Sequence, residues 1–402
     1  MRDFPSISTL QWNGLKREHG RVTESYRCWA EVDLNALRDN LAKIRQLAGP
    51  TSRILTVVKA DAYGHGIRQI AAVLMHSGTD VFGVASLAEA RAVRSVGQGW
   101  PILMLGACLP GEVDTAIEES VMPTLSNLQE AERFSRAAVR QGRQVIAHLK
   151  VDTGMGRLGA PPAEVIPLIQ AMDSLPGLVV RGLYTHFSSV EDDAGFTAAQ
   201  RERFAASLRE LTERGRRFEW VHANNSGGLL LEPPQPGNMV RAGLLVYGIV
   251  PPGSRSRGSD EMRPRFSPAL TWKCRVSQVR EVPAGTPISY GRTFVTQERM
   301  RLAVLAVGYG DGLLRSASNR AAVLVRGRRC RVVGRVTMDQ TVVDATGLPL
   351  VEPGDEAVLL GRQGQEEITA NELAEWCQTI PWEILTNITY RVPRIYRGSH
   401  AA

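Results

Sequence analysis

A lysine stands where an apolar run of the chain ends. The run I-L-T-V-V reaches Lys59 and continues as A-D-A-Y-G-H-G, a pattern typical of a buried strand that ends in a turn of small residues. Such a lysine can simply extend its ammonium into solvent. Held at the edge of an apolar interior, its amine instead has a lowered pKa and can form an imine with a carbonyl. Gly64 and Gly66 favour this second interpretation by allowing close backbone approach to a ligand, and Tyr63 and His65 add polar groups nearby.

The stretch L-T-V-V-K-A-D-A-Y-G-H-G closely resembles the cofactor-lysine motif of alanine racemases, which are pyridoxal-phosphate enzymes that interconvert L- and D-alanine. The resemblance implies that Lys59 carries pyridoxal 5'-phosphate. It extends from about Trp29 to Tyr396, through several further motifs in the same order. Such ordered agreement is far more specific than any one motif.

A glycine-rich segment, H-L-K-V-D-T-G-M-G-R-L-G, spans His148 to Gly159. By itself it would indicate a turn between a strand and a helix, with Arg157 on the surface. In the racemase family the arginine at the position of Arg157 binds the substrate carboxylate, a task suited to a bidentate guanidinium. Lys150 matches a lysine that is often carbamylated in relatives, where it holds that arginine.

Two further residues are expected beside the cofactor ring. His186 closes the run Y-T-H, where a lone histidine is more often a satisfied core residue than a catalytic one. By resemblance it lies against the ring and hydrogen-bonds the catalytic tyrosine. Arg241 is expected at the pyridine nitrogen, to which an arginine can only donate. The nitrogen then stays unprotonated, which weakens the ring as an electron sink and suits racemisation better than transamination.

The segments H-A-N-N-S-G-G and N-M-V-R-A-G-L-L-V-Y-G place small residues after two strands. In eight-stranded α/β barrels the loops after the seventh and eighth strands commonly bind phosphate on backbone N–H groups. The residues that fit such a cradle are Asn225, Ser226, Gly243 and Leu244. Tyr63 and Tyr390 match tyrosines that reach the same phosphate in the family.

Three motifs follow in the second half: I-S-Y-G-R-T-F, A-V-G-Y-G-D-G and G-R-V-T-M-D-Q. Each alone could be an ordinary turn, but all three match the racemase family in order. The resemblance makes Tyr290 the second catalytic base, places Tyr309 at the entry, and brings Met338 and Asp339 to the substrate carboxylate. In the family these groups come from the partner subunit, so we expect a head-to-tail homodimer with shared active sites.

The arrangement of apolar runs predicts the fold of the first half. The eight predicted strands are residues 54–59, 81–86, 102–106, 121–125, 144–151, 178–186, 220–224 and 239–241. Helical patterns separate them, among them residues 87–96, 127–141 and 198–214. Strands alternating with helices predict a parallel (β/α)8 TIM-like barrel, with catalytic groups at the strand C-terminal ends.

The predicted domains are an N-terminal extension of little structure at 1–28, the barrel at 29–255 and a mostly β C-terminal domain at 256–402. Residues 29–34 are predicted to form a strand that can pack with the β domain, and Asp33 and Asn35 are the candidate caps of a helix over 36–47. A Pro- and Gly-rich boundary covers 251–268. The strands predicted beyond it are residues 270–282, 302–307, 321–325, 331–336, 341–343 and 357–360, with one helix at 368–377.

Composition limits the kinds of partner and compartment that the sequence predicts. The net charge of +7 comes largely from arginines, dense in R-G-R-R-C-R-V-V-G-R at 326–335. We interpret that run as a solvated strand face, because no nucleic-acid-binding motif accompanies it. No run approaches the roughly 20 apolar residues of a membrane span, and the five separated cysteines read as free thiols in the cytoplasm, with no metal-ligand spacing.

These observations predict a pyridoxal-phosphate-dependent alanine racemase that uses two bases, Lys59 and Tyr290, and supplies D-alanine for peptidoglycan. Bases on opposite faces of Cα are needed because each enantiomer loses its proton on one face. Alternatives are a broad-specificity or serine racemase of the same family and a non-catalytic pyridoxal-phosphate-binding homeostasis protein, which lacks the β domain. A basic amino-acid decarboxylase is disfavoured by Arg241.

Overall fold

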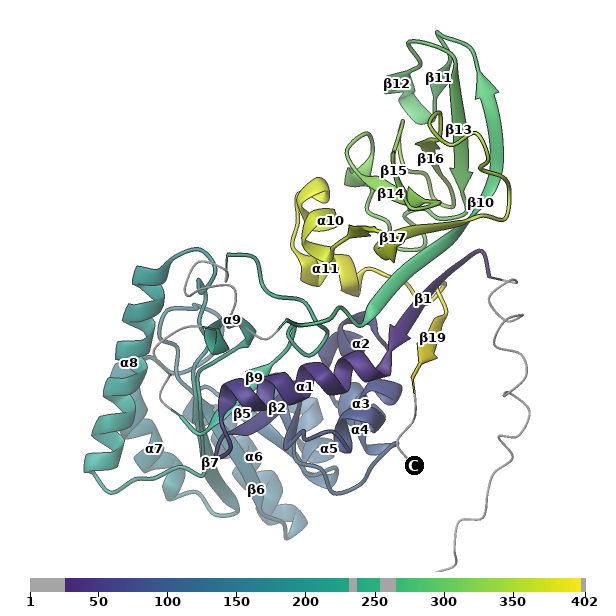
Figure 1. The fold of residues 1–402 in the computed structure, drawn as a ribbon. Helices are drawn as coiled ribbons and strands as arrows, with labels where there is room; N and C mark the ends of the chain where they lie inside the picture. Colours follow the sequence, from purple (N-terminus) through teal and green to yellow (C-terminus); the bar gives the residue numbers. More distant parts are fainter. Residues whose placement is uncertain (1–25, 231–236, 254–264, 399–402) are drawn as a thin grey trace, which may run out of the picture.

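The structure is a computed structural model, and it describes residues 26–230, 237–253 and 265–398. A barrel surrounded by helices and a β-rich domain lie end to end, joined by strands β1 and β10 (Figure 1). The N-terminal extension predicted at 1–28 falls almost wholly outside the described residues, as does most of the boundary predicted at 251–268. Among the described residues, no helix combines the length and the apolar character that crossing a bilayer requires.

Eight parallel strands close into the barrel in sequence order, which confirms the predicted (β/α)8 fold. Its strands are β2 (Arg53–Val57), β3 (Val81–Val84), β4 (Ile102–Ala107), β5 (Val121–Leu125), β6 (Val145–Lys150), β7 (Leu178–Tyr184), β8 (Trp220–His222) and β9 (Met239–Ala242). The residues of β3, β5, β8 and β9 are buried throughout, as expected for parallel strands covered on both faces.

Helices lie around the barrel (Figure 1), with α1 before its first strand and the others after its strands. They are α1 (Leu34–Ala48), α2 (Lys59–Gly64), α3 (Ile67–Met75), α4 (Leu87–Arg94), α5 (Val113–Glu118), α6 (Leu128–Gln141), α7 (Val165–Asp173), α8 (Ala194–Glu213) and α9 (Ser226–Leu229), with 3-10 turns η2 (Pro110–Glu112) and η3 (Pro162–Glu164). Asp33, and not Asn35, caps α1, because its carboxylate accepts from the backbone of Asn35 and Ala36. Ser86 and Asn127 cap α4 and α6 in the same way.

The second domain is built on a mixed sheet in the order β15-β14-β17-β10-β1-β19. Its strands are β1 (Cys28–Asp33), β10 (Leu270–Val282), β13 (Met300–Leu305), β14 (Ala322–Val325), β15 (Arg328–Arg331), β16 (Thr341–Asp344), β17 (Glu356–Gln363), β18 (Glu366–Ile368) and β19 (Arg394–Arg397). A separate ribbon pairs β11 (Pro287–Ile288) with β12 (Phe294–Val295). Its helices are α10 (Ala370–Cys377) and α11 (Pro381–Thr386), with turns η6 (Tyr290–Arg292) and η7 (Arg315–Ala317).

The strand predicted at 331–336 is wrong in its position. The chain instead forms a hairpin of β14 and β15, closed by Arg326 and Gly327 with φ of 49° and 73°. Two consecutive positive φ angles are typical of the tight turns that join twisted strands. Two arginines of this hairpin are paired, Arg326 with Asp355 at 2.7 Å and Arg329 with Glu372 at 2.6 Å.

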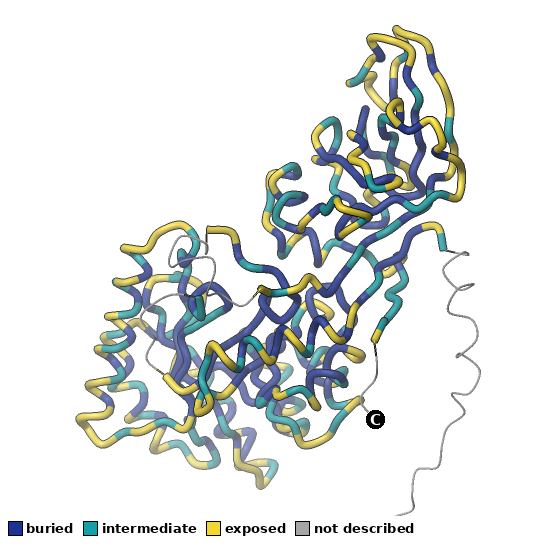
Figure 2. Tube along the Cα trace, in the orientation of Figure 1, coloured by how far each residue is buried: buried dark blue, intermediate teal, exposed yellow. Residues whose placement is uncertain are grey.

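The first strand belongs to the sheet of the second domain. β1 runs antiparallel to β10 and parallel to β19, so the first and the last strands of the described chain lie side by side in this sheet (Figure 1). One continuous apolar core includes Leu37 and Ile54 of the barrel half together with Leu324 and Val358 of the β domain. Figure 2 shows this buried interior running through both parts, with exposed residues on the periphery of the barrel half and at the far tip of the β domain.

Candidate active site

Lys59 follows the first barrel strand, but that strand ends two residues earlier than predicted. β2 stops at Val57, and the four residues after Lys59 form a left-handed turn with φ of 52° to 53°. Left-handed helical geometry costs an L-residue roughly 1–2 kcal/mol. The residues in this conformation are Ala60, Asp61, Ala62 and Tyr63. The turn sets Lys59 and Tyr63 at the C-terminal rim of the barrel.

Side-chain carboxylates hold this unfavourable turn. The backbone N–H of Ala60 donates to Glu89 Oε1 at 2.7 Å, and Ala85 donates to Glu89 Oε2 at 2.7 Å. Asp61 Oδ1 accepts from the N–H of Ile67 at 2.8 Å. Glu89 therefore ties the turn carrying Lys59 to the loop after the neighbouring strand β3.

Gly64 and Gly66 do not serve a ligand as the sequence suggested. A Cβ on Gly64 would lie 2.3 Å from the carbonyl oxygen of Leu385, and one on Gly66 would lie 2.0 Å from the hydroxyl of Tyr396. Both glycines thus make room for the C-terminal segment of the chain. His65 is also internal, since it is fully buried and burial lowers its pKa to about 4.

The amine of Lys59 lies in a strongly cationic environment. Burial lowers its pKa, and the positive charges of Arg157 and Arg241 lower it further. Among the described residues, the carboxylate of Glu89 alone acts in the opposite direction. Burial, followed by the charge of Arg157, also lowers the pKa of Lys150 to about 8. Such an amine is partly neutral near physiological pH and therefore nucleophilic.

The loop after β6 carries Arg157 and is organised by Asp152. The carboxylate of Asp152 accepts from the N–H groups of Gly154, Met155 and Gly156 at 2.8 to 3.1 Å. The loop therefore has a fixed shape, and it leaves Arg157 exposed at the barrel mouth.

Arg241 is buried on β9 and is held on every side. Its Nη1 lies 2.9 Å from His222 Nδ1, and its Nη2 donates to the carbonyls of Thr185 and Ala223 at 2.8 and 2.9 Å. The same Nη2 lies 3.1 Å from His186 Nδ1. Burial lowers the pKa of Arg241 to about 10, which leaves it charged at neutral pH. None of these contacts is a carboxylate.

A small cradle lies after strands β8 and β9. The hydroxyl of Ser226 accepts from the N–H of Gly243 at 2.9 Å and of Leu245 at 3.3 Å. A Cβ on Gly243 would lie 2.8 Å from the hydroxyl of Tyr63, so the missing side chain keeps open the space between Ser226 and Tyr63. Leu244 is buried between the two donors.

Most predicted site residues meet at or just beyond the C-terminal ends of the barrel strands. They are Lys59, Tyr63, Lys150, Arg157, His186, Asn225, Ser226, Arg241, Gly243 and Leu244. Asn225 has a structural contact of its own, because its Oδ1 caps α9 by accepting from Gly228 at 2.8 Å.

The predicted residues of the second half are not brought to this mouth. Tyr290 lies between β11 and β12 at the end of the β domain that points away from the barrel (Figure 1). It is 72% exposed, and Tyr309 and Met338 are 42% and 52% exposed. Within one chain, Tyr290 and Lys59 therefore belong to separate surfaces.

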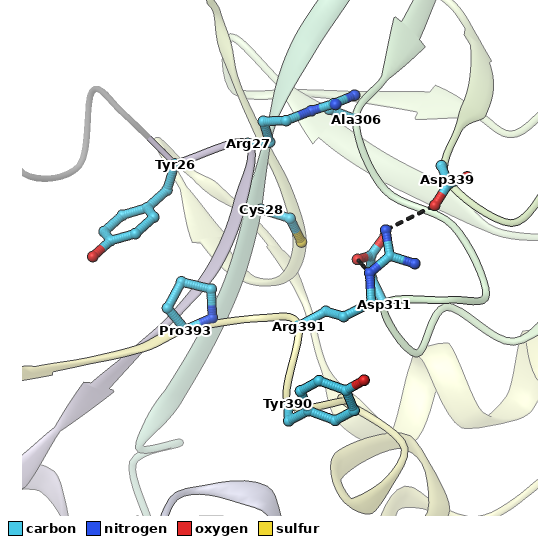
Figure 3. A pocket seen from close by; sticks show the side chains of 9 residues that line it. All are labelled: Tyr26, Arg27, Cys28, Ala306, Asp311, Asp339, Tyr390, Arg391 and Pro393. Atoms are coloured by element: carbon cyan, nitrogen blue, oxygen red, sulfur yellow. Dashed lines mark hydrogen bonds and ion pairs between the residues drawn. The ribbon is translucent and has the colours of Figure 1, made fainter.

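Asp339 and Tyr390 line a cavity of about 550 Å³ in the β domain, next to the start of β1, seen in Figure 3. Arg391 bridges its two acidic side chains, at 2.7 Å from Asp339 and 3.4 Å from Asp311. Tyr390, predicted to reach the phosphate, projects from the rim of this cavity and is 96% exposed.

Four residues that make these contacts were not identified as site residues from the sequence. Glu89 was detectable as the acidic partner of the cap Ser86, and His222 opens the quoted segment H-A-N-N-S-G-G. Asp311 belongs to the motif A-V-G-Y-G-D-G, and Arg391 follows Tyr390 directly. The sequence gives no sign that Asp311 and Arg391 pair, because only the fold brings them together.

Comparison with known proteins agrees with this arrangement over nearly the whole chain. Residues 32–251 match the family "Alanine racemase, N-terminal domain", and residues 269–396 match "Alanine racemase, C-terminal domain". An alanine racemase of Symbiobacterium thermophilum is 44% identical over 93% of this chain and 98% of its own length.

Solved structures agree as well. Alanine racemase from Streptomyces coelicolor superposes with a TM-score of 0.87 at 34% identity, over 94% of this chain and all of that one. The enzyme from Bartonella henselae, solved with covalently bound pyridoxal phosphate, superposes with a TM-score of 0.83 at 27% identity, over 92% and 99%. The barrel half and the β domain thus match proteins of one kind together, and the chain belongs to the alanine racemase family.

Proposed function

We propose that the protein is an alanine racemase that binds pyridoxal phosphate on Lys59 and interconverts L- and D-alanine. The observation that carries the proposal is the environment of the Lys59 amine. Its pKa is lowered by burial and by two arginines, and Ser226 and Gly243 lie in the loops after β8 and β9, at the same C-terminal end of the barrel. A neutral amine beside cationic groups suits a cofactor aldehyde, a phosphate and a substrate carboxylate together.

The residues of the rim fit the cofactor. The space that a Cβ on Gly243 would fill is bordered by the hydroxyls of Tyr63 and Ser226, which can donate to phosphate. Arg241 would face the pyridine nitrogen as a donor, and Lys59 would hold the aldehyde carbon. When bound, pyridoxal phosphate acidifies the Cα–H of an amino acid attached to it by delocalising the electrons of the broken bond.

The chain's own residues then move the proton. We propose that Lys59 Nζ exchanges a proton with Cα on the face of D-alanine, and that Tyr290 Oη does so on the face of L-alanine. Arg157 would orient the substrate carboxylate through its guanidinium. Arg241 keeps its proton at neutral pH because its pKa of about 10 is well above 7, so it does not protonate the ring nitrogen fully. By leaving the ring nitrogen unprotonated, Arg241 would favour return of the proton to Cα by Lys59 or Tyr290 over transamination.

Because Tyr290 is remote from Lys59 in one chain, we propose that two chains associate head to tail and complete each other's sites. The exposed side chains of Tyr290, Tyr309 and Met338 are apolar or aromatic groups that a partner barrel would cover. A mixing experiment tests this. Chains with Lys59→Ala and chains with Tyr290→Phe are each expected to be inactive, and after dissociation and reassociation a mixture should recover roughly one quarter of full activity. If activity did not recover, both bases of a site would have to come from the same chain.

The activity itself is tested by chiral analysis of products from a panel of amino acids. Alanine should be racemised in both directions with the highest kcat/KM, and serine should distinguish a broad-specificity or serine racemase. Borohydride reduction followed by peptide mapping should find the cofactor on Lys59. A label on Lys150, the other lysine with a lowered pKa, would overturn the assignment.

We further propose that the enzyme supplies D-alanine for peptidoglycan from the cytoplasm. All five cysteines are free and buried, which suits a reducing compartment. Growth of a bacterial strain that requires D-alanine, after introduction of this chain, would test the supply. Failure of an active enzyme to restore growth would contradict it.

A further inference from the structure

A chain of polar side chains runs through the middle of the barrel, below the active-site rim. Arg241 on β9 contacts His222 on β8 at 2.9 Å, and His222 Nε2 lies 2.9 Å from Nδ1 of His148 on β6. All three side chains are buried. Barrel interiors are usually filled by bulky apolar layers, so a buried polar chain at this place calls for a reason.

The contacts determine where the protons lie. A guanidinium can only donate, so His222 Nδ1 must accept from Arg241. Burial lowers the pKa of His222 well below its usual value, so the ring is neutral and carries its one proton on Nε2. That Nε2–H then donates to His148 Nδ1. His148, with a pKa lowered to about 3 by burial, is neutral as well and must carry its own proton on Nε2.

The neighbouring strand is shaped to permit this contact. His148 and His222 stand on β6 and β8, with β7 between them. Gly182 on β7 is opposite His148, and a Cβ there would lie 2.2 Å from His148 Nδ1. The absence of a side chain lets the imidazole pass over β7. On its other side the ring stacks on Trp220 at 5.1 Å, which fixes its plane.

His222 is fixed in the same manner, because its ring stacks on Tyr184 at 4.6 Å with an interplanar angle of 5°. The hydroxyl of Tyr184 lies 2.8 Å from Thr124 Oγ1, which itself donates to the carbonyl of Met104 at 2.7 Å. Both imidazoles can therefore shift little, and what remains variable is the position of the proton on each ring.

We infer that His148 is a positioning residue: by accepting the Nε2 proton of His222 it holds that ring in the one tautomer whose Nδ1 can accept from Arg241. It thereby fixes the guanidinium of Arg241, which the proposed function places at the cofactor ring, from a strand three positions away in the barrel. This role rests on the proposed function of Arg241, whereas the tautomer assignment stands on the contacts alone. If His148 only filled space, neither of its ring nitrogens would be needed.

The test is 15N NMR of the holoenzyme labelled at histidine, which gives a simple spectrum because the chain has seven histidines. A His222→Gln variant assigns the signals of His222. We expect one signal pair for His222, with the proton on Nε2. His148→Phe removes the acceptor and should give a second tautomer or an averaged signal, whereas His148→Gln keeps an acceptor and should retain the original pattern.

Racemisation by the same variants gives the functional readout. His148→Phe should lower kcat between about twofold and tenfold, the range that one hydrogen bond supports, and leave KM for alanine unchanged. His148→Gln should recover most of the loss. Gly182→Ala alters no hydrogen-bonding group but displaces the His148 ring, and should behave like His148→Phe. Phe82→Leu, a substitution in the apolar barrel core, is the control for lost packing.

Two results would overturn the inference. One is a proton on Nδ1 of His222 in the unmodified protein, which can be read even if no variant of His148 folds. The other is an equal loss of kcat in His148→Phe and His148→Gln at equal stability, which would mark a packing role. If the tautomer pattern is as expected but alanine is not racemised, the proposed function fails and the positioning contact stands.

Discussion

The guanidinium of Arg241 lies 3.1 Å from Nδ1 of His186, so this imidazole can only accept at Nδ1 and must carry its proton on Nε2. Burial and the charge of Arg241 lower the pKa of His186 well below its usual value, which keeps the ring neutral. A neutral ring with Nε2–H is a hydrogen-bond donor at the barrel mouth. It is suited to stabilise the phenolate that the proposed second chain would bring there.

Tyr290→Phe should therefore remove one of two bases and leave cofactor binding intact. Because Tyr290 is 72% exposed, the free energy of unfolding should change by less than about 0.5 kcal/mol. Racemisation should fall by about 10² to 10⁴ in both directions, since the missing group is needed once in each. In deuterated solvent the variant should still exchange the α-hydrogen of D-alanine through Lys59, while exchange of L-alanine becomes very slow. Equal slowing of both exchanges would contradict the assignment of faces.

Glu89→Gln should shift the pKa of Lys59 further down. The carboxylate of Glu89 is the one nearby charge that raises this pKa, so its neutralisation leaves burial and the two arginines unopposed. In apoprotein, the rate of cofactor uptake depends on the neutral amine, and its pH midpoint should move to lower pH.

A matched control exists for this change. Glu130 makes the same contacts at the start of α6 as Glu89 makes at the start of α4. Its carboxylate accepts from the N–H of Ser126 at 2.7 Å, and its own N–H donates to Asn127 at 2.9 Å. Glu130→Gln should leave the midpoint of cofactor uptake where it was. A shift of equal size in both variants would assign the effect to a lost helix cap.

Lys150 should form a carbamate with dissolved carbon dioxide. The reaction needs the neutral amine, and with a pKa of about 8 the neutral fraction grows as pH rises through that value. The carbamate is an anion, so Arg157 would have a negatively charged neighbour in place of the positively charged lysine. 13C NMR in labelled bicarbonate should show one carbamate signal that increases with pH and disappears in Lys150→Arg. That variant should also raise KM for alanine, because Arg157 loses its partner. Persistence of the signal would assign the carbamate elsewhere.

The sequence predicted the barrel well because parallel strands that are buried on both faces read as continuous apolar runs. β10 was predicted with its observed bounds, whereas the strand predicted at 331–336 was displaced because Arg326 and Gly327 form a turn inside the arginine run. Motif agreement led to Lys59 and Arg241. It could not reveal the left-handed turn at Ala60, since no local pattern favours that conformation, or the contact between His148 and His222, which lie 74 residues apart.

The last prediction concerns Gly64, whose role is structural. At φ of 77° any side chain is strained, and a Cβ would in addition lie 2.3 Å from the carbonyl oxygen of Leu385. Arg394 anchors the same point, because its Nε donates to the carbonyl of Gly64 at 2.9 Å. A substitution here should therefore push α11 away from the turn that carries Lys59.

Gly64→Ala is best compared with Gly215→Ala, because Gly215 has a φ of 81° and no atom within 4 Å of the added Cβ. The control should lose about 1 kcal/mol of unfolding free energy through backbone strain alone. Gly64→Ala should lose at least about 2 kcal/mol more, since the clash is with backbone, which cannot rotate away. Urea unfolding of both variants measures the difference. Because the displaced turn holds Lys59, cofactor affinity should fall in Gly64→Ala and stay unchanged in Gly215→Ala. Equal stability losses with equal cofactor affinity would show that the contact with Leu385 contributes nothing.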